Sequence, residues 1–338
     1  MSKEKILEVK GLQTSFYTHL GEVQSVRNVD FDLYKGEVLG VVGESGSGKS
    51  VTCSSVMRLL QHPGKIKAGE VLFKGEDLVK KTDKEMRKIQ GNEMSMIFQD
   101  PMSALNPVYT IGNQMVEVIR QHKKVSKKEA EAIAIKMLSL VGIPSPEERM
   151  KNYPHEFSGG MRQRAVIAMA LSCDPELVIA DEPTTALDVT IQAQILELMK
   201  DLQERLNSSI IFITHDLGVI AQLCTRVIVM YGGMVMEEAL VDELFYDAKH
   251  PYTIGLLNSV PNPNAKTKER LEPIPGLPPD LLNPPKGCPF CNRCQYAMKK
   301  CLNEMPSMHQ VSETHKSRCH LLLKEAPMVE GFVKEARM

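Results

Sequence analysis

The most informative segment of this chain is Gly43-Glu44-Ser45-Gly46-Ser47-Gly48-Lys49-Ser50. It follows the apolar run Val38–Val42, which is typical of a strand buried on both faces, and a helical stretch comes after it. Glycines at this spacing let the backbone turn so that successive N–H groups point inward and bind phosphate oxygens at a helix N-terminus. Lys49 adds a cation for the β- and γ-phosphates, and the Ser50 hydroxyl is a natural Mg²⁺ ligand. The stretch therefore predicts a nucleotide-binding phosphate loop.

The rest of the chain supports an α/β fold around this loop. The first ~35 residues alternate apolar and polar side chains, which predicts antiparallel strands with one exposed face. Later apolar runs are short and continuous, and they predict a parallel sheet covered by helices. These runs are Met94–Phe98, Leu177–Ala180, Ile210–Ile213 and Val227–Met230.

Between about residues 100 and 157 helical patterns replace the strand runs, which predicts a helical insertion. Within it, Ser126 and Glu129 form a capping box for a helix that runs to about Leu140, with Gly142 just past its end. Six prolines between Pro273 and Pro285 exclude regular helix there. We expect a nucleotide-binding domain over residues 1–250 and a small Pro-rich and Cys-rich region over residues 251–338.

Composition narrows the class of protein. The chain has 338 residues and a formal net charge of −1, so no global field attracts nucleic acid, and we expect no nucleic-acid partner. No apolar stretch near Met1 resembles a signal peptide, and no run reaches the ~18 apolar residues of a membrane helix. We expect a cytosolic protein whose contact with any membrane is made through a partner.

A second acidic motif completes the phosphate site. Asp181 and Glu182 directly follow the apolar run that ends at Ala180. Asp181 is suited to hold Mg²⁺ through its water shell. Glu182 is suited to polarise a water molecule for in-line attack on the γ-phosphate. Together with the phosphate loop, these two acids predict ATP hydrolysis.

Four smaller motifs occur elsewhere along the chain. They are Gln99, Ser158-Gly159-Gly160-Met161-Arg162-Gln163-Arg164, Ala186-Leu187-Asp188 and His215. In order and spacing they resemble the Q-loop, signature motif, D-loop and switch histidine of the ATP-binding-cassette (ABC) ATPases. The resemblance covers roughly residues 5–250, and it implies the ABC type of P-loop NTPase fold with an N-terminal antiparallel β subdomain.

The resemblance also implies a mechanism. In this family two ATPase domains face each other head to tail and enclose two ATP molecules. Ser158, Gly159, Gly160 and Asp188 are then expected to contact the ATP bound by the partner domain. Gln99 would contact Mg²⁺ and the attacking water, and His215 would bind the γ-phosphate and orient Glu182.

The family further implies an aromatic ring stacked on adenine. Phe16 fits the usual register, and Tyr17 is the alternative.

Further matches point to one branch of the family. The segments Phe98–Pro107, Phe157–Met161, His250–Thr253 and Gly287–Phe290 resemble the D-type ATPase of bacterial dipeptide and oligopeptide importers. This resemblance implies a heterodimer with a sister ATPase, with a homodimer as the alternative. It also implies two membrane permeases, a solute-binding protein outside the membrane, and a peripheral position on the cytoplasmic face of the cell membrane. Similar subunits serve nickel, glutathione and sugar-oligomer importers, so the substrate stays open.

Five cysteines gather near the C-terminal end: Cys288, Cys291, Cys294, Cys301 and Cys319. Four thiolates can hold Zn²⁺ or an iron–sulfur cluster, and unliganded thiols are the remaining alternative. The resemblance to peptide importers implies a [4Fe–4S] cluster on Cys288, Cys294, Cys301 and Cys319, with Cys291 as a possible substitute ligand. We expect this metal site to lie far from ATP and to order a segment that has little apolar core of its own.

Three hypotheses follow from these patterns. The first is the ATPase subunit of an importer, which the complete hydrolytic set favours. The second is an iron–sulfur sensing or redox protein that uses nucleotide as a switch. The third is a cassette ATPase acting on nucleic acid, which the absence of a basic stripe disfavours.

Overall fold

The computed structural model describes residues 4–185, 187–259, 273–327 and 329. Ala186 of the expected D-loop lies outside the described residues. The chain forms two compact units, which we describe separately. The first unit contains Met1–Ile6, Leu33–Val38 and Lys80–Ile213, and the second contains Leu7–Asp32, Leu39–Val79 and Thr214–Met338. The predicted boundary at residue 250 stays a prediction.

The first unit contains a parallel arrangement of three short strands. β7 (Leu177–Asp181) pairs in parallel with β6 (Met94–Ile97) on one side and with β8 (Ser209–Thr214) on the other. Every residue of β7 and β8 is buried, as the continuous apolar runs predict. The carboxyl end of β7 carries Asp181 and Glu182, so the strand positions both acids.

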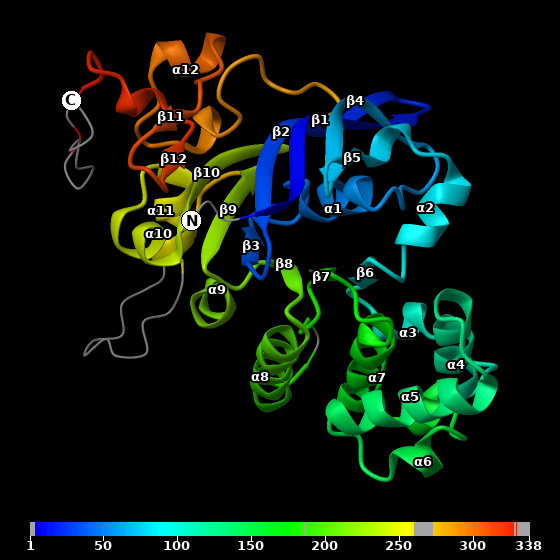
Figure 1. Cartoon of the computed structure of the whole chain (residues 1–338). Coiled ribbons are helices and arrows are strands. Elements are labelled where there is room, and N and C mark those ends of the chain that lie inside the picture. Colours follow the sequence, from blue (N-terminus) through cyan, green and yellow to red (C-terminus); the bar gives the residue numbers. More distant parts are fainter. Residues whose placement is uncertain (1–3, 186, 260–272, 328, 330–338) are drawn as a thin grey trace, which may run out of the picture. The chain divides into compact units, whose positions relative to one another are not determined.

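Helices make up most of the rest of this unit, and α3 to α7 lie in one group (Figure 1). The α-helices of this unit are α2 (Asp83–Ile89), α3 (Pro101–Ala104), α4 (Ile111–His122), α5 (Lys127–Leu140), α6 (Pro146–Arg149), α7 (Gly159–Leu171) and α8 (Val189–Leu206). α5 begins with the predicted capping box between Ser126 and Glu129, and it ends at Leu140. Gly142 follows with a φ of 72°, a conformation that glycine adopts without strain.

The second unit contains an antiparallel sheet with the strand order β2-β1-β4-β5. These strands are β1 (Lys5–Thr18), β2 (Gly21–Tyr34), β4 (Gly64–Phe73) and β5 (Glu76–Asp77). β1 pairs antiparallel with β4, and Leu7 and Val9 of β1 are buried. The alternating pattern of the first residues correctly predicts this sheet.

The same unit also holds the phosphate-loop strand, β3 (Val38–Val42), which pairs in parallel with β9 (Arg226–Tyr231). From β9 the sheet continues antiparallel through β10 (Met234–Leu240), β12 (Lys316–Ser317) and β11 (His309–Gln310). The helices of this unit are α1 (Lys49–Val56), α9 (Leu217–Leu223), α10 (Val241–Asp247), α11 (Pro251–Asn258) and α12 (Lys299–Asn303). The C-terminal segment therefore adds two strands beside β10 (Figure 1).

The C-terminal segment packs the Phe290 ring into an aromatic cluster with residues of other elements. Phe290 is buried between two other buried rings, with centroids 5.3 Å from Tyr231 and 5.3 Å from Tyr252. Tyr231 belongs to β9 and Tyr252 to α11. The sequence pattern missed this cluster because it is built from single aromatic residues far apart in the chain, which leave no local periodicity.

A buried carboxyl group fastens the C-terminal strands to β10. Glu237 is fully buried and lies 2.7 Å from His315 Nε2. It also accepts hydrogen bonds from the backbone N–H groups of Lys249 and His250. One side chain thus joins β10, the start of α11 and the turn before β12.

We predict that Glu237→Ala lowers the free energy of unfolding by about 3 kcal/mol, because it leaves His315 and two N–H groups buried without a partner. The matched control is Glu243→Ala. Glu243 accepts from Ser312 and Thr314 of the same C-terminal segment, but at the surface, so its loss costs about 1 kcal/mol. Urea titration of both variants measures the difference. Equal losses would contradict the central role of Glu237.

Candidate nucleotide site

Three glycines set the path of the phosphate loop. Gly43, Gly46 and Gly48 have φ values of 151°, 77° and 101°. A Cβ on Gly43 would stand 2.2 Å from the carbonyl oxygen of Met230, so no other residue fits there. A Cβ on Gly46 would meet nothing within 4 Å, so the space above the loop is open. The loop is a backbone cradle of the kind that binds phosphate.

Lys49 and the start of α1 complete the cradle. Lys49 Nζ donates to the carbonyl oxygens of Gly43 (2.7 Å) and Glu44 (3.1 Å). Gly48 caps α1 without a side-chain hydrogen bond. The buried Ser47 hydroxyl has no hydrogen-bond partner among the described residues, and such orphaned groups are uncommon. These features fit the binding of ATP phosphates, which carry many acceptor oxygens. Ser45 and Ser50 of the loop are exposed.

The two aromatic side chains that could stack on adenine, Phe16 and Tyr17, lie on opposite faces of β1. Thr14 Oγ1 lies 2.8 Å from Ser55 Oγ of α1, so this face of the strand meets the phosphate-loop helix. Phe16, two residues on, points to the same face, whereas Tyr17 points to the other and is 45% exposed. The face shared with Thr14 favours Phe16.

The acids of the first unit form a second cluster. Gln99 Nε2 donates to Glu182 Oε2 at 3.1 Å, and Thr185 Oγ1 donates to the same oxygen at 2.9 Å. Glu182 has a φ of 47°, an uncommon value for a residue with a side chain, and its N–H donates to the carbonyl of Ile213. Asp181 is buried at the end of β7. The fold therefore brings Gln99 and Glu182 together, although they lie 83 residues apart in sequence.

The signature and D-loop residues stand at two helix starts of the same unit. Ser158 caps α7, and its hydroxyl accepts from the Met161 N–H at 3.3 Å. Asp188 caps α8 in the same way, accepting from the Ile191 N–H at 2.9 Å. Ser158, Gly159 and Asp188 are exposed, and Gly160 is partly exposed. This exposure leaves them open to a second molecule.

His215 belongs to the second unit, where it directly follows β8 and is exposed. The site residues therefore divide into two groups. The first unit holds Gln99, Ser158, Gly159, Gly160, Asp181, Glu182 and Asp188, and the second holds Phe16, Tyr17, the phosphate loop and His215.

One contact to the phosphate loop has no local signal in the sequence. Arg293 binds the carboxylate of Glu44 with both terminal nitrogens, at 2.6 and 3.0 Å. The hydrogen bonds to Glu44 raise the pKa of Arg293 above its usual value. Arg293 lies between Cys291 and Cys294, so one side chain of the cysteine-bearing turn reaches the phosphate loop. The expected separation of the metal site from ATP stays a prediction. Arg293 and Glu44 are 249 positions apart, and no local pattern announces such a pair.

All five C-terminal cysteines line one small cavity of about 10 Å³, together with His250 and His320. Burial raises the pKa of Cys288 to about 12 and that of Cys294 to about 11, so both favour the protonated thiol at neutral pH. The donor set fits a thiolate-bound metal. As placed, however, the described residues contain no group of three His, Cys, Asp or Glu side chains arranged to hold a metal ion.

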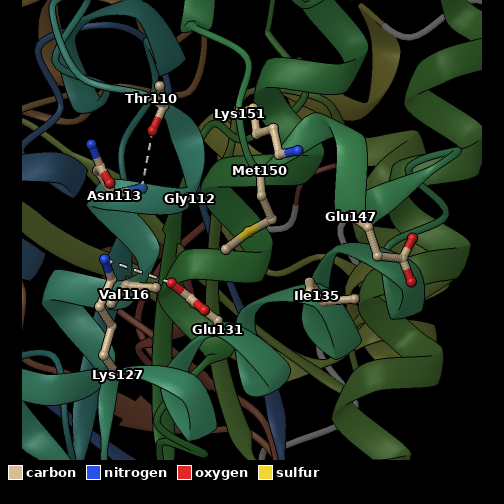
Figure 2. A pocket seen from close by; sticks show the side chains of 10 residues that line it. All are labelled: Thr110, Gly112, Asn113, Val116, Lys127, Glu131, Ile135, Glu147, Met150 and Lys151. Carbon is tan, nitrogen blue, oxygen red and sulfur yellow. Dashed lines mark hydrogen bonds and ion pairs between the residues drawn. The ribbon is translucent and has the colours of Figure 1, made fainter.

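The helical part of the first unit holds a separate cavity of about 420 Å³. Figure 2 shows its mixed lining, with the Lys127–Glu131 ion pair (3.8 Å) on one side and Glu147 on another. None of the predicted site residues lines it. This cavity is therefore separate from the nucleotide motifs.

Comparisons with known proteins agree with this geometry. Residues 26–185 match the family model described as ABC transporter, and residues 236–301 match the model described as oligopeptide/dipeptide transporter, C-terminal region. The oligopeptide transport ATP-binding protein OppD of Bacillus subtilis is 58% identical over 96% of this chain and 91% of its own length. The dipeptide transport ATP-binding protein DppD of the same organism is 56% identical over 94% and 95%.

The chain belongs to the ATP-binding subunits of oligopeptide and dipeptide ABC transporters. A dimeric structure of the ATP-binding cassette MJ0796, bound to ADP and Pi, superposes with a TM-score of 0.63 at 26% identity, covering 70% of this chain and 98% of that one. The predicted fold class and ATPase class are therefore confirmed. Family membership also favours the transporter hypothesis over the iron–sulfur sensor and the nucleic-acid ATPase.

Like its family, this ABC ATPase is expected to use ATP and Mg²⁺. Among the described residues, no helix combines the length and apolarity needed to cross a membrane.

We predict that Phe16→Ala weakens ATP binding about tenfold, the cost of losing one base-stacking ring. Tyr17→Ala is the matched control, and it should change the affinity by less than about twofold, because its ring points to the other face of β1. Equilibrium dialysis with ATP measures both. A larger loss in Tyr17→Ala would reverse the assignment.

Proposed function

We propose that this chain hydrolyses ATP to power the import of dipeptides or oligopeptides through a membrane ABC transporter. The observation that carries this proposal is the contact between Gln99 and Glu182 at the end of a buried strand, in a chain that also holds a complete phosphate loop. The peptide class is taken from the related OppD and DppD proteins.

In the proposed mechanism, Glu182 positions the attacking water. Its carboxylate is fixed by Gln99 and Thr185, so it needs little reorganisation before the reaction. The loop N–H groups and Lys49 bind the phosphates, while His215 orients Glu182. Ser50 and Gln99 would hold Mg²⁺, with Asp181 acting through the water shell, and the metal would neutralise charge on the phosphates.

The proposed active form is a head-to-tail pair of ATPase subunits. Exposed Ser158, Gly159, Gly160 and Asp188 would contact ATP bound by the partner subunit. The start of α7 offers N–H groups and the positive end of a helix dipole to the γ-phosphate. A sister ATPase is the proposed partner, with a second copy of this chain as the alternative.

The proposed assembly includes two membrane permeases, so the chain would act as a peripheral subunit at the cytoplasmic face of the membrane. A solute-binding protein outside the membrane would deliver the peptide. The division into a nucleotide-binding domain over residues 1–250, with its insertion over 100–157, and a C-terminal region over 251–338 is part of the same proposal.

We predict that Glu182→Gln lowers ATP hydrolysis by roughly 10²–10⁴-fold while ATP binding persists, because the amide keeps the shape but cannot act as a base. The control is Glu131→Gln, which removes a half-exposed acid of the helical part. Phosphate release and nucleotide binding are measured on the same samples of the assembled transporter. Normal turnover in Glu182→Gln would contradict the proposed mechanism.

We also propose that Cys288, Cys294, Cys301 and Cys319 hold a [4Fe–4S] cluster, with Cys291 as a substitute ligand and Zn²⁺ as the alternative metal. Support comes from the cavity that these thiols share and from their chemistry. Bound metal would add folding free energy to this segment.

We predict about four irons per chain and broad absorbance near 400 nm in protein purified without air. Cys301→Ser should lose the iron, whereas Cys291→Ser should keep it. Metal analysis of the variants tests this. One zinc per chain would replace the iron assignment, and metal loss in Cys291→Ser alone would contradict the ligand set.

A further inference from the structure

Glu44, the second residue of the phosphate loop, is held at three points. Its backbone N–H donates to Tyr252 Oη at 2.8 Å. Its carbonyl oxygen accepts from Lys49 Nζ at 3.1 Å, and its carboxylate is bound by Arg293. Two of these three contacts come from residues beyond the nucleotide motifs. The conformation of the loop therefore depends on the C-terminal part of the chain.

Arg293 is itself fixed in place. Its Nε donates to the Pro275 carbonyl at 2.8 Å and its Nη2 to the Ile274 carbonyl at 3.2 Å. Its Nη1 donates to Tyr231 Oη at 3.0 Å. The side chain is only 5% exposed, so the guanidinium cannot swing away into water. The planar guanidinium group of Arg293 donates hydrogen bonds in several directions at once, and the single ammonium nitrogen of a lysine cannot reproduce them.

The segment that positions Arg293 is the one that carries the cysteines. The Arg293 N–H donates to the carbonyl of Phe290, in a short turn that begins at Cys291. The N–H of Cys288 donates to the carbonyl of Cys301, which brings the two ends of the segment 288–301 together. The short turn Cys291–Arg293 thus connects the cavity-lining thiol of Cys291 directly to the guanidinium of Arg293 along the backbone.

Charge gives this contact a role in nucleotide binding. Glu44 is 28% exposed at its side chain and lies in the loop that we propose binds a polyanion. An unpaired carboxylate at this position repels the phosphates, whereas a carboxylate paired with Arg293 does not.

We propose that Arg293 is a positioning residue of the ATP site, which neutralises Glu44 and holds the phosphate loop. A change at the thiols that line the cysteine cavity then alters ATP affinity through Arg293. This inference rests on the proposed binding of ATP by the loop. It makes the C-terminal segment a built-in regulator of the ATPase.

The test is a double-mutant cycle on the full chain, with dissociation constants for ATP, ADP and AMP at low and high salt. Arg293→Gln is expected to weaken ATP binding about tenfold at low salt, ADP less and AMP least, because the repulsion grows with phosphate charge. Glu44→Gln should bind ATP more tightly than the wild type, and Glu44→Gln/Arg293→Gln should return to within about twofold of the wild type. Lys300→Gln, an exposed charge change in the same segment, is the control and should bind like the wild type.

Several outcomes would overturn the proposal. Equal losses for ATP and AMP, or a double variant as weak as Arg293→Gln, would mean that Arg293 acts only on folding. If Arg293→Gln does not fold, Glu44→Gln decides alone, since weaker ATP binding in that variant contradicts the proposal. Failure of the wild type to bind ATP would instead refute the proposed function.

A separate experiment tests the link between the cysteine-lined cavity and ATP affinity. Cys301→Ser should weaken ATP binding in the wild-type background but not in the Glu44→Gln background. Cys173→Ser, a buried cysteine of the other unit, is the matched control and should leave ATP binding unchanged. Unchanged ATP affinity in Cys301→Ser, with the segment after residue 273 more open to protease, would refute control by the cavity.

Discussion

The close approach of the phosphate loop to the end of β9 sets the path of the loop. A Cβ at Gly43 would stand 2.2 Å from the Met230 carbonyl, so the chain can pass there only as glycine. That passage is possible because β3 and β9 are parallel neighbours and deliver both segments to the same edge. The N–H groups of the loop are thereby fixed before a ligand arrives, which lowers the ordering cost of binding.

The same unit extends this rigidity into the C-terminal segment. Phe290 packs between Tyr231 and Tyr252, and these tyrosines also contact Arg293 and the Glu44 backbone. Apolar packing and the partly buried ion pair between Arg293 and Glu44 thus fasten the cysteine-lined segment to the loop. A transporter subunit built this way has its nucleotide affinity set partly by residues outside the cassette motifs.

Sequence reasoning succeeded where the signal is local. The phosphate loop, the buried strand runs and the capping box of α5 each lie within a few consecutive residues, and each fixes its own structure. It failed for the Glu44–Arg293 pair and for the aromatic cluster, because single residues far apart meet only through the fold. The choice between Phe16 and Tyr17 falls between these cases. It needed the contact of Thr14 with α1 to tell which face of β1 meets the phosphate-loop helix.

We infer that residues 43–50 bind ATP through backbone N–H groups and Lys49. Calorimetric titration of Lys49→Ala with Mg·ATP tests it most directly. We predict a loss of affinity of about a hundredfold, the value of a charge-assisted hydrogen bond to phosphate, in a protein that stays folded. Affinity equal to that of the wild type would show that Lys49 does not bind the phosphates of ATP.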